Sequence, residues 1–169
     1  MLALILIVFG VALRFLPHTP NVNPVAAIAL FGATMLPNKR LVLIVPLALM
    51  ITSDLFLGMH DIIVFTWGSV VLISLLGLSL KKCRRSTTIL AGSVLSSVIF
   101  FVITNFGVWL SGWYPMTAAG LGQCFIAAIP FFRNFTASTL FYSCVLFGTY
   151  EIAARVVQNT KLAPALLNK

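Results

Sequence analysis

The chain has 169 residues, of which 60 % are hydrophobic and 8 % are charged, and its mean hydropathy is +1.09. Soluble domains are about a quarter charged, so this composition excludes an ordinary soluble enzyme and indicates an integral membrane protein. The net charge is +8. We attribute it to basic residues that set the orientation in the membrane and contact anionic lipid headgroups. We expect no nucleic-acid partner, because that function requires a clustered basic face on a soluble module.

Seven apolar runs follow one another along the chain. They cover residues 2–15, 25–36, 41–57, 62–80, 88–110, 117–132 and 135–157. A spanning helix needs about 20 apolar residues, and the glycines and proline within 117–132 make that run a poor lipid-facing helix. We predict an all-α polytopic membrane protein with about six transmembrane helices and a re-entrant or interfacial segment at about 117–132. Residues 1–157 would form a single transmembrane domain, and residues 158–169 a short cytoplasmic tail.

The basic residues predict the orientation in the membrane. If the loop KKCRR at 81–85 is cytoplasmic and residues 117–132 do not cross, nine basic residues lie inside and two, Arg14 and Arg133, lie outside. If residues 117–132 cross, the division becomes seven against four. The first arrangement fits the excess of basic residues inside better, and it places both termini in the cytoplasm.

Polar side chains gather on the opposite side, at helix ends and in loops. This sorting predicts a ligand pocket that opens to the outside. The predicted pocket residues are Met50, Asp54, Asn105 and Trp109, with Arg14 and Arg133 as contacts for anionic groups and His18, Asn21 and Asn23 as part of a lid.

Asp54 lies about one turn from the outer end of its predicted helix. A carboxylate at that depth is costly unless it faces the bundle and finds a partner, and Arg14 and Arg133 carry the guanidinium groups on that side. Asp54 either contacts a ligand or ion, or forms a structural ion pair. Asp61 precedes the apolar run IIVFTW and is predicted to cap that helix. A metal site that includes His60 is the weaker alternative, so we expect no metal and no cofactor.

Small residues at four-residue spacing permit close approach between helices. Ala29 and Ala33 form such a face in the second apolar run, and this face packs either within the chain or against a partner protein. In the fifth run, Ser93 and Ser97 are predicted to be helix-packing contacts. The P-loop, H-E-x-x-H and G-x-S-x-G motifs are absent from the sequence, so we do not expect an enzyme.

The stretches PHTPNVNPVAAIALFGA, SDLFLGMHD, TNFGVWL and AAIPFFRN together resemble a family of small, uncharacterised bacterial integral membrane proteins. The architecture is similar, more distantly, to the S components of energy-coupling-factor transporters. That resemblance implies a substrate-binding subunit in the bacterial inner membrane for uptake of a vitamin-like small molecule. It further implies a transmembrane coupling subunit, docked through Ala29 and Ala33, and separate ATPases. In S components this face lies on the first helix, whereas here it falls on the second run.

One alternative function belongs to a different class. The chain would then be a non-catalytic structural or assembly subunit of a larger membrane complex. Its interfaces would be the small-residue face and an aromatic belt formed by Trp109, Trp113 and Tyr114. An open small-residue face would favour this alternative, and a polar-lined cavity would favour the transport subunit.

Overall fold

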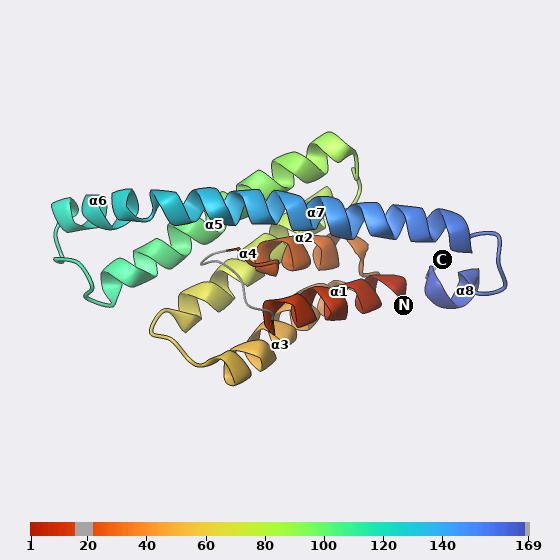
Figure 1. Cartoon of the computed structure of the whole chain (residues 1–169), viewed down its shortest axis with the longest axis horizontal. Helices are drawn as coiled ribbons and strands as arrows, with labels where there is room; N and C mark the ends of the chain where they lie inside the picture. Colours follow the sequence, from red (N-terminus) through yellow and green to blue (C-terminus); the bar gives the residue numbers. More distant parts are fainter. Residues whose placement is uncertain (16–21, 168–169) are drawn as a thin grey trace.

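The computed structural model describes residues 1–15 and 22–167, and this part of the chain is a bundle of helices (Figure 1). The elements are α1 Leu2–Ala12, η1 Leu13–Phe15, α2 Val25–Met35, α3 Lys39–Leu57, α4 Ile63–Leu80, α5 Ser86–Leu110, α6 Ala118–Ala127, α7 Ile129–Val157 and α8 Ala163–Leu166. The prediction of an all-helical fold is confirmed for the described residues.

Four helices are long and apolar enough to cross a membrane: α3 from Arg40, α4, α5 and α7. Helices of this length and hydropathy are typical of a membrane protein. The remaining apolar helices α1, α2 and α6 are shorter, so the predicted count of six spans stays a prediction. Helix α6 has 10 residues and extends about 15 Å at 1.5 Å per residue. That is roughly half the thickness of the hydrocarbon core, so α6 does not span by itself.

Helix α2 lies at the centre of the bundle and packs against α1, α3, α4, α5 and α7 (Figure 1). All ten residues from Val25 to Thr34 are buried. A helix that is apolar on every side has no face suited to water, and the small residues in VAAIALFGATM let its neighbours approach closely. The short second run of the sequence is therefore the core of the protein.

The predicted docking role of Ala29 and Ala33 is wrong, because both residues are fully buried inside the chain. Their helix packs closely on α4. A Cβ atom added to Gly77 of α4 would lie 2.4 Å from the Cβ atom of Ala33 and 3.0 Å from the carbonyl oxygen of Leu30. The small-residue face thus serves packing within the chain, and no surface remains there for a partner.

Buried serines of α5 form hydrogen bonds with backbone carbonyls of their own helix. Ser93 and Ser97 are fully buried on α5, as helix-packing contacts should be. The Ser93 hydroxyl donates its one proton to the Ile89 carbonyl of its own helix at 2.9 Å, and it forms a hydrogen bond with the Ser143 hydroxyl of α7 at 2.8 Å. Such bonds let a serine occupy an apolar interface without an unsatisfied group.

The two ends of the bundle differ in charge and in the elements they contain. The N-terminal amine donates to the Leu166 carbonyl at 3.2 Å, so the described ends of the chain meet (Figure 1). At this same end, Lys81 donates to the Pro37 carbonyl at 3.1 Å, which joins the turns α2–α3 and α4–α5. Met1, Lys81 and Leu166 line one small cavity at this end, and the predicted cytoplasmic location of these segments stays a prediction. We call this the basic end.

Candidate functional site

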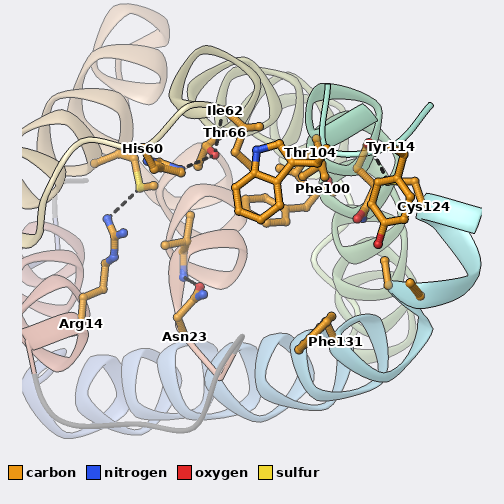
Figure 2. A pocket seen from close by; sticks show the side chains of 17 residues that line it. Arg14, Asn23, His60, Ile62, Thr66, Phe100, Thr104, Tyr114, Cys124 and Phe131 are labelled. Carbon is orange, nitrogen blue, oxygen red and sulfur yellow. Dashed lines mark hydrogen bonds between the residues drawn. The ribbon is translucent and has the colours of Figure 1, made fainter. Parts of the chain in front are cut away.

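A cavity of about 460 Å³ lies at the end of the bundle opposite the basic end. It is formed by η1, the residues before α2, α3, α4, α5, the α5–α6 loop, α6 and the start of α7 (Figure 2). Its walls are Arg14, Asn23, Val25, Met50, His60, Ile62, Thr66, Phe100, Thr104, Asn105, Val108, Trp113, Tyr114, Cys124, Ala127, Ala128 and Phe131. We call this space the upper cavity.

Arg14 is held in the wall of the upper cavity by a buried carboxylate. Its guanidinium group lies 3.0 Å from an Asp54 oxygen and also donates to the hydroxyl of Ser53 and, at 2.8 Å, to the sulfur of Met50. The other Asp54 oxygen accepts the indole N–H of Trp67 at 2.9 Å. Asp54 is 3 % exposed and does not line the cavity. The ion-pair interpretation of Asp54 is therefore confirmed. The Asp54 carboxylate, on the side of Arg14 away from the cavity, largely neutralises the charge of Arg14.

The turn between α3 and α4 supplies another side of the cavity. Gly58 ends α3 with a φ of 109°, a conformation that favours glycine. His60 follows, and its Nε2 atom lies 3.2 Å from the Thr66 hydroxyl of α4 (Figure 2). The predicted capping role of Asp61 is wrong, because α4 begins after Ile62 without a side-chain cap. Within residues 1–15 and 22–167, His60 is not part of a cluster of three potential metal ligands.

Helix α5 contributes the inner wall. Phe100, Thr104 and Val108 recur every fourth residue and so share one face, which lines the cavity beside Asn105. The Asn105 amide donates to the Phe101 carbonyl at 2.7 Å. That bond uses one of its two N–H groups, and within the described residues the second N–H and the side-chain oxygen make no hydrogen bond, so both can meet a ligand.

The loop after α5 and the helix α6 cover the side of the cavity that faces Arg14 and Asn23. Figure 2 shows Tyr114 and Cys124 across the cavity from those two residues. The loop packs tightly on α6, since a Cβ atom added to Gly120 would lie 2.0 Å from the Pro115 oxygen.

Cys124 in α6 is protected rather than activated. Its thiol donates to the Asn105 backbone oxygen at 3.4 Å. Burial raises the pKa of this thiol, because a thiolate loses its hydration there. The group is therefore protonated at neutral pH and lacks the low pKa of a reactive cysteine.

The predicted pocket residues divide into three groups. Arg14, Asn23, Met50 and Asn105 line the upper cavity. Asp54 lies behind the wall, Trp109 donates its indole N–H to the Pro115 carbonyl at 3.0 Å without lining the cavity, and Arg133 is exposed outside it. His18 and Asn21 lie outside the described residues.

Several lining residues were not predicted, among them His60, Thr66, Thr104 and Cys124. The four-residue stripe of Phe100, Thr104 and Val108 would have found one of them. The other three reach the cavity through the α3–α4 turn and through the packing of α4 and α6, which no local sequence pattern predicts.

Comparison with known proteins places the chain in a family. Residues 1–164 match a family of unknown function, DUF6580. The chain belongs to this family. The match covers nearly all of the chain, as expected from the resemblance to an uncharacterised family. No curated protein and no solved structure matches the chain.

Proposed function

We propose that the protein is the substrate-binding membrane subunit of a small-molecule uptake system and that the upper cavity holds the substrate. The observation that carries this proposal is the cavity itself. Its volume of about 460 Å³ lies within the range of small-molecule sites, and a few polar groups converge in it among apolar and aromatic walls. In the proposed orientation the cavity faces the outside and the basic end faces the cytoplasm.

The chemistry of the walls supports one class of substrate. Aromatic rings come from Phe100, Phe131, Trp113 and Tyr114, and hydrogen-bonding groups come from several neighbouring side chains. Because Arg14 already pairs with a carboxylate, it offers hydrogen bonds rather than a free positive charge. These features fit a molecule with a planar apolar body and neutral polar groups, such as a vitamin-like heterocycle.

The alternative function is an assembly subunit of a larger complex. An open small-residue face would have favoured this alternative, and that face is fully buried around α2. A coupling subunit with ATPases, proposed as the source of energy, would therefore dock elsewhere on the surface.

The proposal is tested by the small molecules that co-purify with the protein in mild detergent. Mass spectrometry of the extract should identify one metabolite in stoichiometric amount. Ala127→Trp places a large ring in the cavity wall, whereas Ala119→Trp adds the same ring on the same helix away from the cavity. We expect the metabolite to be lost from the first variant and retained by the second. Retention by both variants, or a large complex without a metabolite, would contradict the proposal.

A further inference from the structure

A second cavity, of about 660 Å³, lies at the basic end between the start of α5 and the C-terminal half of α7. Its lining residues are Met35, Arg84, Arg85, Ser86, Ile89, Leu90, Ser143, Cys144, Phe147, Gly148, Glu151 and Arg155. We call it the basic groove. It shares no lining residue with the upper cavity.

The groove has an excess of positive charge. Three arginines, Arg84, Arg85 and Arg155, line it together with one carboxylate, Glu151. In the described part of the chain the one ion pair is in the wall of the upper cavity, so no carboxylate of a described residue lies within ion-pair distance of these guanidinium groups. Arg84 instead donates to the sulfur of Met35 at 3.2 Å, and a thioether is a weak acceptor. Guanidinium groups bind phosphate oxygens with two parallel hydrogen bonds.

The beginning of α5 adds to the attraction for an anion. The helix has 25 residues, and its N-terminal turn has no side-chain cap. Free backbone N–H groups and the positive end of the helix dipole therefore lie beside the arginines. Ser86, the first residue of the helix, lines the groove.

The groove continues into an apolar surface. Ile89, Leu90 and Phe147 form its apolar wall. Along the same two helices, large side chains such as Leu90, Val94 and Val145 are about 40 % exposed. Such a surface, directly next to a cationic site, matches a molecule that has an anionic group at one end and hydrocarbon at the other.

We propose that the basic groove binds the headgroup of one anionic phospholipid, with the phosphodiester on the arginines and the acyl chains along α5 and α7. Basic pockets between helices on the cytoplasmic side of a membrane are suited to this role. A free phosphate would use the same arginines but would leave the apolar wall without a partner. This inference does not depend on the function of the upper cavity.

The test uses native mass spectrometry of the detergent-purified full chain after delipidation. Phosphatidylglycerol and phosphatidylcholine with identical acyl chains are added separately. We expect the wild-type protein to retain one phosphatidylglycerol and to release phosphatidylcholine. Arg84→Gln/Arg155→Gln should weaken phosphatidylglycerol binding at least about tenfold, as the loss of a charge-assisted hydrogen bond predicts. Glu151→Gln should strengthen it.

The control variant is Arg40→Gln/Lys82→Gln, which removes the same net charge from side chains outside the groove. It should change binding less than about threefold if the groove, and not charge in general, holds the lipid. An equal loss in both double variants, or equal retention of the two lipids, would overturn the proposal. So would displacement of the lipid by soluble glycerol phosphate at the same concentration, because the site would then take the phosphate group alone.

A second measurement works even if an arginine variant folds poorly. Cys144 lines the basic groove and Cys124 lines the upper cavity. In a Cys83→Ser protein, phosphatidylglycerol should slow the alkylation of Cys144 and leave the alkylation of Cys124 unchanged. Equal rates for Cys144 with and without the lipid would show that the groove is empty.

Discussion

Replacing Asp54 by asparagine should destabilise the protein by about 3 kcal/mol. The asparagine keeps one acceptor oxygen for the Trp67 indole N–H but turns an amide N–H₂ group toward Arg14. Of its partners among the described residues, Arg14 would then keep the hydroxyl of Ser53 and the sulfur of Met50. Breaking a buried ion pair costs about 3–5 kcal/mol. The lower value applies here because the Arg14 side chain is 12 % exposed at the cavity.

The assay is thermal unfolding in detergent, followed with a thiol-reactive fluorogenic dye. In a Cys83→Ser/Cys144→Ser background the dye reports on Cys124, which is 2 % exposed in the folded protein. For a chain of this size about 1 kcal/mol corresponds to roughly 2–4 °C, so Asp54→Asn should lower Tm by about 6–12 °C. Trp67→Phe removes one hydrogen bond, worth about 1 kcal/mol, and should lower Tm by about 2–4 °C.

A double-mutant cycle separates the ion pair from other effects of the substitution. Arg14→Gln should also destabilise the protein, because Asp54 loses its cationic partner. The double variant Arg14→Gln/Asp54→Asn contains no unpaired charge, so it should lose at least about 1.5 kcal/mol less than the sum of the single variants. Additive losses, or a Tm of Asp54→Asn within about 1 °C of the wild type, would refute the ion-pair explanation.

Two further predictions concern packing and thiol chemistry. Gly77→Ala should destabilise the protein by about 1–3 kcal/mol, because the new Cβ atom would lie 2.4 Å from the Cβ atom of Ala33. The control is Gly68→Ala on the same helix, whose new Cβ atom meets nothing within 4 Å. This variant should be neutral or slightly stabilising in the same assay. Cys124 should react with N-ethylmaleimide more slowly than exposed Cys83 at pH 8, because burial raises the pKa of the Cys124 thiol and the reagent attacks the thiolate. The rate at Cys124 should rise at a higher pH than that of a free thiol, and a pH–rate profile that matches free cysteine would contradict this.

Helical structure, which depends on residues close together in the chain, was predicted correctly for the described residues. Hydropathy and length indicate helices and a membrane protein, because these depend on composition within one segment. The count of basic residues predicted that both termini and the loop around Lys81 are cytoplasmic, and this stays a prediction. Met1, Lys81 and Leu166 do line one cavity at the basic end. The need of Asp54 for a guanidinium partner also followed from elementary electrostatics, since an isolated carboxylate is costly at that depth.

The tertiary structure decided which surfaces meet. Helix α2 is apolar on every side, so its sequence contains no periodic mark that separates an inner from an outer face. Only its position among five neighbouring helices shows that Ala29 and Ala33 are buried. The upper cavity is likewise formed where helix ends and loops from distant parts of the chain converge, which brings His60 near Arg14. Burial depends on the partner of a helix face, and that partner is a property of the whole fold.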